Sequence, residues 1–406
     1  MTVFNVKKRY LVFFLILCFG CSANQSSENT DKLSQLKNLS VFPAGNSQVV
    51  DMSFTQDRIY GSIGDVVIGN IDDIAIDDSG KVFIADSKKS TIHVFGSNGD
   101  YLTHIGRKGK GPGEFYRVSD VQIKDHKLFA YDLTRFRYHV FSLDSLTFRY
   151  TVNFADNKNN VKEISDAHLN SGFVRNNSTF LAQFTQNVYT ENKDWGTLEV
   201  RGLYYLLDRD GNINSKKLME SKTQMNVLVP FQGGATDRQG NYTQMRRMGY
   251  QPGFYGKALL ELSEENHIYW AWTDTFLIKV YSPEGEYQRA INYQYKNVPL
   301  SRESATKAGI PNFILKGWQS MNLPKNWPAL NNMKIDDKNR LWVSTIVENF
   351  EVYQWWVLKD SGELLTRFTW PRQRELKEVK NGYAYILEKD EETGLQHVVR
   401  YRIEME

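Results

Sequence analysis

Lysines and arginines recur in four loops of the sequence, two of which contain glycine, and they are the residues with the clearest potential for binding chemistry. Arginine presents forked N–H donors that match a carboxylate or phosphate, and glycine lets backbone N–H groups approach an anion closely. The loops are SKKS (87–90), GRKGKGPGEFYR (106–117), LTRFR (133–137) and MRRMGY (245–250). They predict an anion-binding surface formed by Arg107, Lys108, Lys110, Arg117, Arg135, Arg137, Arg246 and Arg247. The alternative is that these side chains are only solvated and that GKGPGEF is a structural connector.

The sequence holds no local motif for covalent or metal chemistry. GRKGKGPG lacks the G-K-[ST] ending of a nucleotide loop, no G-x-S-x-G is present, and no two histidines are spaced as H-x-H or H-x-x-x-H. Asp86 and Asp132 end equivalent strands and could act as general bases or ion ligands, but aspartate at turns more often accepts loop N–H groups. His93 and His139 also occupy equivalent positions, which favours packing. We predict no catalytic residue, metal ligand or cofactor, although a site assembled from distant segments would leave no local motif.

The elements that must position these loops are short β-strands. Residues 72–115 contain the alternating segments DDIAID, KVFIAD, TIHVFG and YLTHIG, separated by the turns DSG, SKKS and SNGD. Alternation over four to six residues between such turns is typical of antiparallel strands.

The same four-strand pattern recurs along the chain. IDDSGKVFIAD (76–86) is echoed at 123–132, 262–272, 335–345 and 379–389, and TIHVFGSNGDYLTHI (91–105) at 137–152, 203–218, 277–291 and 353–368. The shift from Ile76 to Ile123 is 47 positions (123 − 76), and that from Ile335 to Val379 is 44 (379 − 335). A four-stranded antiparallel unit that repeats with this period predicts the blades of a β-propeller.

A family resemblance supports this fold. GKGPGEF (109–115), preceded by DSGKVFIAD and followed by VSDVQI, resembles the NHL-repeat pattern. Over about residues 40–406, and most clearly in the first two repeats, the chain resembles the six-bladed β-propeller lipoproteins of Gram-negative bacteria. The resemblance implies an all-β, six-bladed propeller that is exported and lipid-anchored. It implies no single reaction, because related propellers include sensors, scaffolds, RNA binders and lyases.

Residues 1–20 have the features of a lipoprotein signal peptide. Lys7, Lys8 and Arg9 precede an apolar stretch that is too short to span a membrane. Gly20 and Cys21 resemble the end of a bacterial lipobox, so Cys21 is the candidate lipidation site, where a diacyl anchor would hold stably. We expect an outer-membrane lipoprotein of the cell envelope that faces the periplasm or the exterior. The alternative is ordinary secretion.

Charge and composition narrow the range of partners. The chain carries 50 basic and 47 acidic residues, a net charge of +3. The leader holds three basic residues and no acidic ones, so the mature protein is formally neutral (+3 − 3 = 0), which argues against a nucleic-acid partner. Residues 21–40 are polar and predict a flexible tether, followed by the propeller over 41–406.

The last repeat supplies only three clear strands, so an N-terminal strand is expected to complete that blade and bring the termini together. Insertions at 219–257 and 296–330 interrupt the pattern as functional loops or as plugs over the mouth or a blade edge. Ser301 is expected to cap a short helix in the second insertion. We expect packing between blades for Trp270, Trp272, Trp342, Trp355 and Trp356.

Three functions fit these observations. The favoured one is a non-catalytic module that recognises a ligand or protein partner, including an anionic small molecule or glycan at the basic loops. The second is a metal-dependent hydrolase or lyase with its site in the propeller funnel, which a bound metal would indicate. The third is a carbohydrate-binding accessory protein that uses Trp318 and Trp327, which exposure of these side chains would indicate. The lack of a catalytic constellation favours the first.

Overall fold

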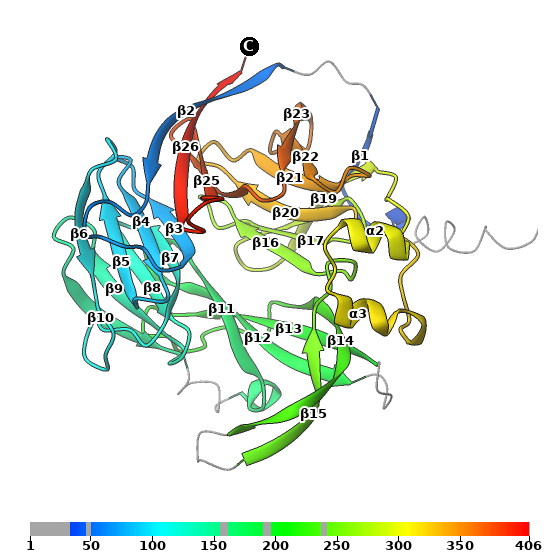
Figure 1. Ribbon diagram of the computed structural model, residues 1–406, viewed down its shortest axis with the longest axis horizontal. Helices are drawn as coiled ribbons and strands as arrows, with labels where there is room; N and C mark the ends of the chain where they lie inside the picture. Colours follow the sequence, from blue (N-terminus) through cyan, green and yellow to red (C-terminus); the bar gives the residue numbers. More distant parts are fainter. Residues whose placement is uncertain (1–32, 46–49, 155–160, 190–195, 237–241, 406) are drawn as a thin grey trace, which may run out of the picture.

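The computed structural model describes residues 33–45, 50–154, 161–189, 196–236 and 242–405, and its strands form six sheets around a common centre (Figure 1). Within each repeat the strands of a sheet are antiparallel. Successive residues of a strand point to opposite faces of the sheet, and both faces are buried between neighbouring sheets. The six sheets are the blades of the predicted propeller, numbered here in chain order.

The first three blades follow one another along the chain. Blade 1 consists of β3 (Ile71–Ile76), β4 (Val82–Asp86), β5 (Thr91–Phe95) and β6 (Tyr101–Ile105). Blade 2 consists of β7 (Val118–Lys124), β8 (Lys127–Asp132), β9 (Arg137–Ser142) and β10 (Phe148–Asn153). Blade 3 has β11 (His168–Val174), β12 (Phe180–Tyr189), β13 (Thr197–Leu207), β14 (Met219–Thr236) and β15 (Tyr242–Tyr250), with 3₁₀ turns η2 (Lys162–Ile164) and η3 (Asn176–Ser178).

The other three blades include strands from the N-terminal segment. Blade 4 consists of β16 (Ala258–Leu262), β17 (Ile268–Trp272), β18 (Leu277–Tyr281), β19 (Tyr287–Gln294) and β1 (Leu39–Pro43). Blade 5 consists of β20 (Leu330–Ile335), β21 (Leu341–Ile346), β22 (Val352–Leu358) and β23 (Leu364–Pro371). Blade 6 consists of β24 (Glu375–Lys380), β25 (Tyr383–Lys389), β26 (Gln396–Met405) and β2 (Met52–Tyr60).

The hydrophobic core is divided among the blade interfaces. Successive inner strands contact one another, among them β3 with β7, β16 with β20, and β24 with β3. Five large apolar clusters lie between blades and another lies at the insertions, whereas a small one lies between blades 3 and 4. Trp342 is an example of a side chain packed at a blade interface: it is fully buried, and its Nε1 donates to Asp336 Oδ2 at 2.9 Å. Among the described residues, no helix is long and apolar enough to span a membrane.

The predicted closure of the ring is confirmed. β2 is antiparallel to β26, with Met52 opposite Met405 and Tyr60 opposite Val398. Figure 1 shows the blue N-terminal strand beside the red C-terminal strand. Blade 6 is thus held together by both ends of the chain, and β2 covers the edge that β26 would otherwise expose.

A second N-terminal strand was not predicted. β1 pairs in parallel with β19, so the chain joins blade 4 before it reaches blade 6. Between these strands it crosses the edge of blade 5, where Val50 N donates to Leu365 O at 3.0 Å and Arg367 Nη1 donates to Ala44 O at 3.1 Å. Strand structure therefore begins at Leu39, two residues inside the segment expected to be a tether.

The two insertions pack against each other beside blade 4. The first forms the long β14 and β15, which extend from the ring in Figure 1. The second forms α2 (Arg302–Lys307), α3 (Asn312–Lys316) and η4 (Trp318–Ser320). Ser301 caps α2 as predicted, because its side chain accepts from Ser304 N. One apolar cluster, which includes Val229 and Trp327, joins the two insertions, so a structural role accounts for their apolar residues.

Candidate functional site

The six inner strands enclose a central channel with a volume of about 490 Å³. All six blades contribute to its wall, and five of them contribute charged side chains from the inner strand. These residues are Asp72, Asp73, Asp120, Lys124, Glu261, Lys334, Lys377, Glu378 and Lys380. A concave site at which several elements converge is the usual place for a ligand, and here it lies on rigid strands.

A β-bulge at the same place in five inner strands determines which side chains reach the channel. Asp73 follows Ile71 in the pairing register with β4, which leaves Asp72 inserted between them. The same shift lies between Val118 and Asp120, Leu169 and Ser171, Leu330 and Asn332, and Leu376 and Glu378. A bulge twists its strand and redirects neighbouring side chains. The residue after the inserted one is therefore equivalent around the ring: Asp73, Asp120, Ser171, Asn332 and Glu378.

The carboxyl group of Asp120 lies in a hydrogen-bond network with Gln122 and Tyr138. Asp120 Oδ2 lies 2.7 Å from Gln122 Nε2 and 3.1 Å from Tyr138 Oη. The same hydroxyl lies 2.5 Å from Gly172 O. Gln122 and Tyr138 both donate to the carboxyl group and so favour its ionised form, which leaves burial and the charge of Asp73 as the causes of its raised pKa.

Burial raises the pKa values of the channel carboxyl groups. Burial raises the pKa of Asp120 to about 7, and the negative charge of neighbouring Asp73 adds to the effect. Burial likewise raises the pKa of Asp73, Glu261 and Glu378, the last to about 8. The channel therefore holds carboxyl protons near neutral pH.

The lysines of the channel are already paired. Lys334 Nζ lies 3.1 Å from Glu261 Oε1, and this carboxylate is the main cause of its raised pKa. Lys124, Lys377 and Lys380 lie 2.8–3.0 Å from carboxylate oxygens of Glu264, Glu375 and Asp78. Asp73, Asp120 and Glu378 have no ion-pair partner among the described residues. These three residues are called the carboxyl triad below.

The carboxyl triad can bind a cation or exchange protons. A ligand ammonium or guanidinium would replace the carboxyl protons with charge-assisted hydrogen bonds. Two carboxyl groups that hold a proton near neutral pH can also serve as general acid and base. Within the part of the chain that the structure describes, no group of three or more His, Cys, Asp or Glu residues is placed to hold a metal ion.

The predicted glycine-rich loop already contains a carboxylate from its own chain. Glu114 Oε2 accepts from Gly111 N at 2.8 Å, and Glu114 Oε1 accepts from Arg107 Nε at 2.7 Å. These two contacts, the Gly111 N–H first, lower the pKa of Glu114. The donors expected to meet an external anion are therefore occupied by Glu114.

Several of the other predicted basic residues have partners within the protein. Arg135 lies 4.6 Å from the Tyr116 ring centroid, and Arg135 and then Lys110 lower the pKa of this tyrosine. Arg117 lies 3.9 Å from Asp72, and Arg137 is largely buried 3.9 Å from Asp132. Lys108 is exposed, the side chains of Arg246 and Arg247 on β15 lie outside the described part, and so does Cys21.

Replacing Glu114 by alanine is expected to create an anion site in this loop. The change frees Arg107 and the Gly111 N–H, so the affinity for inorganic phosphate should rise at least about tenfold, in line with two charge-assisted hydrogen bonds. Calorimetric titration with phosphate measures the gain. Glu303→Ala, which removes an exposed glutamate paired with Lys307, is the control. Equal phosphate affinity in wild type and Glu114→Ala would show that the loop is only a connector.

The structural roles expected for the aspartates and histidines of the loops are confirmed. Asp86 accepts from Gly69 N at 2.6 Å and Asn70 N at 3.1 Å, and Asp132 accepts loop N–H groups at 3.1 and 3.2 Å. His139 is fully buried, and burial lowers its pKa to about 4, so it packs as a neutral ring. His93 is also buried, 3.3 Å from Asp86 Oδ2.

The tryptophans divide into two groups. Trp342, Trp355 and Trp356 are buried between blades, as predicted. Trp270 and Trp272 differ from the prediction, because both are only partly buried and line a groove between blades 3 and 4. The alternating pattern of β17 directs their side chains to the side where blade 3 packs least closely.

The tryptophans of the second insertion do not form an exposed platform. Trp327 is 2% exposed, and its Nε1 donates to Ser304 Oγ at 3.0 Å. Trp318 is partly buried against Phe254. A carbohydrate site in the second insertion is therefore not supported.

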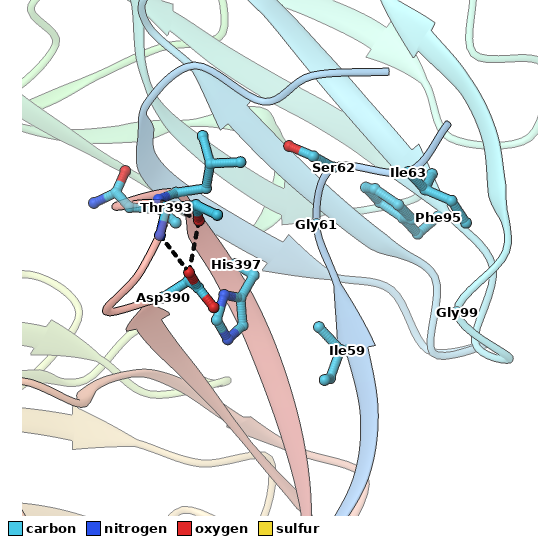
Figure 2. Close-up of a pocket in the computed structure, with 11 residues that line it drawn as sticks. Ile59, Gly61, Ser62, Ile63, Phe95, Gly99, Asp390, Thr393 and His397 are labelled. Atoms are coloured by element: carbon cyan, nitrogen blue, oxygen red, sulfur yellow. Dashed lines mark hydrogen bonds between the residues drawn. The ribbon is translucent and has the colours of Figure 1, made fainter. Parts of the chain in front are cut away.

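A shallower hollow lies at the junction of blades 6 and 1 (Figure 2). Its rim carries the exposed apolar side chains Ile59 and Ile63. The carboxylate of Asp390 is held by its own turn, because Thr393 N and Oγ1 both donate to Oδ1 at 2.7 Å. The hollow thus offers less uncompensated charge than the channel.

Sequence reasoning missed the carboxyl triad, although the repeats contain a signal for it. In IDDIAI (71–76), VSDVQI (118–123) and LKEVKN (376–381), the third residue is acidic. An acidic residue at the same position of an otherwise apolar inner strand is costly to bury, and it recurs here in three blades. The bulge that turns these positions toward the channel has no comparable signal in the sequence.

Six blades closed by an N-terminal strand around a charged channel define the chain as a six-bladed β-propeller. A family model described as "6-bladed beta-propeller" matches residues 63–232, which agrees with the sheets observed there. No curated protein matches the sequence.

Several solved structures are similar to the chain. A member of the duf4221 family from Bacteroides vulgatus is 12% identical, with a TM-score of 0.50 over 87% of this chain and 99% of that one. A protein provisionally described as exported, from Bacteroides fragilis, is 12% identical, with a TM-score of 0.47 over 90% and 100%. Virginiamycin B lyase from Staphylococcus aureus is 10% identical, with a TM-score of 0.39 over 87% and 99%. At these identities the likeness concerns the fold alone.

Proposed function

We propose that the protein is an exported, lipid-anchored recognition module that binds a small organic cation in its central channel. The observation that carries the proposal is the carboxyl triad, in which Asp73, Asp120 and Glu378 come from three different blades. None of the three forms an ion pair among the described residues, because the lysines beside them are paired with other carboxylates. These lysines act on Asp73 and Glu378 only from a longer distance, where they oppose the effect of burial on the pKa.

The chemistry of the triad selects the ligand class. An ammonium or amidine group would donate to two or more of these carboxylates, and each charge-assisted bond contributes about 1.5–3 kcal/mol. Binding would expel the carboxyl protons, because a nearby cation favours the ionised form. Affinity should therefore rise as pH increases through the raised pKa values, about 7 for Asp120 and about 8 for Glu378.

The cellular setting of the proposal rests on the leader. An export signal that ends at Cys21 supports an outer-membrane lipoprotein with a membrane partner through its lipid, facing the periplasm or the exterior. Recognition without turnover is supported by the absence of a nucleophile motif in the sequence. If the ligand were instead an anion, it would bind at Lys110 and Arg135, which both interact with Tyr116.

A second candidate function is a hydrolase or lyase that uses the same channel. The observation that favours it is the adjacent pair Asp73 and Asp120. Burial raises the pKa of both carboxyl groups, and their negative charges repel each other. Such a pair supplies both a proton donor and a proton acceptor near pH 7.

Titration of the mature protein with putrescine, agmatine, arginine and glucosamine tests the proposal, with acetate and phosphate as anionic probes. At least one amine should bind, and Glu378→Gln should weaken it about tenfold or more. Glu375→Gln is the matched control on the same strand, since Glu375 is half exposed and paired with Lys377; it should change affinity less than about twofold. Failure of every amine to bind, or an equal effect of both variants, would refute the proposal. Substrate turnover that is lost in Asp120→Asn would instead identify an enzyme.

A further inference from the structure

The interface between blades 3 and 4 is packed differently from the others. Its apolar cluster of buried residues contains Leu181, Tyr204 and Ile268. The neighbouring interface between blades 2 and 3 buries a much larger set that includes Phe129, Phe154 and Phe180. Because closely packed interiors leave few voids, the sparse packing here leaves space between the two blades.

Part of this space is a polar cavity of about 350 Å³ beside the inner strands. Its lining is dominated by neutral amide side chains from blade 3 and the segment that follows it. The amides are Asn170, Gln183, Asn187, Gln224, Asn226 and Gln251. Two of them are buried, since Gln183 and Asn226 are each 7% exposed. A buried amide on a blade face is costly unless it is hydrogen-bonded. The amides gathered here must therefore find hydrogen-bond partners either in one another or in a ligand.

Internal hydrogen bonds use only part of this amide surface. Asn170 Nδ2 donates to Gln183 Oε1 at 2.7 Å, Gln183 Nε2 donates to Tyr204 Oη, and Gln224 Nε2 donates to Asn226 Oδ1 at 2.6 Å. These bonds use both polar atoms of Gln183, but each amide has two N–H donors and an oxygen with two lone pairs, so the other amides keep donors and acceptors for the cavity. Asn187 is exposed at its rim. The cavity can therefore both donate to and accept from the hydroxyl groups of a ligand.

The outer part of the interface is an aromatic groove of about 200 Å³. Trp270 and Trp272 lie two residues apart on β17, and Tyr281 lies on the adjacent β18, so all three face the same side of blade 4. Two contacts hold the indoles in place: Trp272 Nε1 donates to Asp274 Oδ2 at 2.8 Å, and Lys279 Nζ lies 5.7 Å from the Trp270 ring centroid. Among the described residues, the buried Trp270 Nε1 has no hydrogen-bond partner.

The aromatic groove and the amide cavity adjoin. Lys222 lines the groove and the next residue, Thr223, lines the cavity. On blade 4, Trp272 in the groove pairs in register with Ala258 in the cavity. An extended ligand could therefore lie across both parts of the interface, which are together called the blade 3–4 cleft.

We propose that the blade 3–4 cleft binds a neutral oligosaccharide. Aromatic rings stack on the C–H faces of sugars, and neutral amides hydrogen-bond with sugar hydroxyls in both directions. Carboxylates are absent from the described lining of the amide cavity, and its one charged side chain is Lys257. The aromatic groove carries charges of both signs, Glu220 with Lys222 and Lys279, so the cleft as a whole presents no cluster of several charges of one sign. The proposal is independent of the cation site in the channel, because the two share no side chain.

Titration of the mature protein with maltohexaose, xylohexaose and mannohexaose, followed by calorimetry and by tryptophan fluorescence, tests this site. At least one oligosaccharide should bind and change the fluorescence. Trp270→Ala and Trp272→Ala should each weaken binding about tenfold, as loss of one stacking ring does. Asn187→Ala, at an exposed position that folding tolerates, should weaken it about threefold. Phe313→Ala removes a 45% exposed aromatic ring outside the cleft and should leave binding unchanged.

Two further outcomes separate the blade 3–4 cleft from the channel. Glu378→Gln should leave oligosaccharide binding unchanged, and Trp272→Ala should leave amine binding unchanged. The proposal is overturned if none of the three oligosaccharides binds, if the tryptophan and Asn187 variants bind as tightly as wild type, or if a peptide such as hexaalanine binds and no oligosaccharide does.

Discussion

Replacement of Asp120 by asparagine is expected to stabilise the protein at alkaline pH. Burial and the charge of Asp73 raise the pKa of Asp120 to about 7 in the folded state, against 3.8 for an ordinary aspartate. The folded state therefore holds this proton more tightly than the unfolded chain, and wild-type stability falls as pH rises from about 4 to above 7. Asparagine resembles the protonated carboxyl group because it is uncharged at every pH, and its amide oxygen can still accept from Tyr138.

The expected difference is large at pH 8.5 and small at pH 5. At pH 8.5, Asp120→Asn should exceed the wild type by roughly 2 kcal/mol in the free energy of unfolding. At pH 5 the two should agree within about 0.5 kcal/mol. Urea titrations at both pH values measure this, with Asp144→Asn in an exposed turn as the control. An Asp120→Asn protein that loses stability equally at both pH values would contradict the assigned protonation. The same variant should bind amines poorly, so a gain in stability would accompany a loss of function.

Removal of both N-terminal strands is expected to prevent the ring from closing. A chain that begins at residue 61 lacks β2, which contributes the fully buried Tyr60 and the partner of Arg400, whose Nε donates to Asp57 Oδ2 at 2.6 Å. Blade 6 would then have three strands, and β26 would present an open edge that favours aggregation. We expect loss of the cooperative unfolding transition and a shift to aggregates.

A chain that begins at residue 45 separates the contribution of β1 to stability from that of β2. It lacks β1, which packs Phe42 against Tyr293 at a centroid distance of 5.1 Å, but it keeps the closure by β2. We expect it to fold and to lose about 1–3 kcal/mol, the range for burial of one large apolar side chain. Size-exclusion chromatography and thermal unfolding of both truncated chains make the comparison. A folded monomer from residue 61 onward would show that ring closure by β2 is dispensable.

The fold could be predicted because its signal is repeated. Alternation between turn residues appears in each blade, so one irregular repeat does not hide the others, and the missing strand of the last repeat identified the role of the N-terminal segment. β1 was missed because a parallel edge strand of five residues has no turn or partner nearby in the sequence; its pairing with β19 depends on the closed ring.

The candidate sites were harder to predict than the fold, for a physical reason. A charged loop residue can be seen in the sequence, but whether it is free to bind a ligand depends on its neighbours in space. Arg107 is an example, because it is paired with Glu114. Conversely, Asp120 looked like a strand residue among others, and only the ring of blades brings it beside Asp73. Trp272 followed the alternation of a core strand, and its partial exposure arises from the sparse packing of blade 3 against blade 4.

The N-terminal segment that joins blades 4, 5 and 6 also sets the order in which the molecule can assemble. Asn38 hydrogen-bonds with Gln288, 250 positions away, and Asp57 pairs with Arg400, 343 positions away. A chain made from its N-terminus exposes β1 and β2 first, gains β19 only with blade 4, and gains β26 only with blade 6, so this segment lacks strand pairing while the first blades form. Contacts so distant in sequence slow folding, and unpaired strands invite misassembly. Pairing of β2 with β26, which completes the ring, is therefore a late step of folding. Until it takes place, the β26 edge of blade 6 is unpaired and accessible to chaperones.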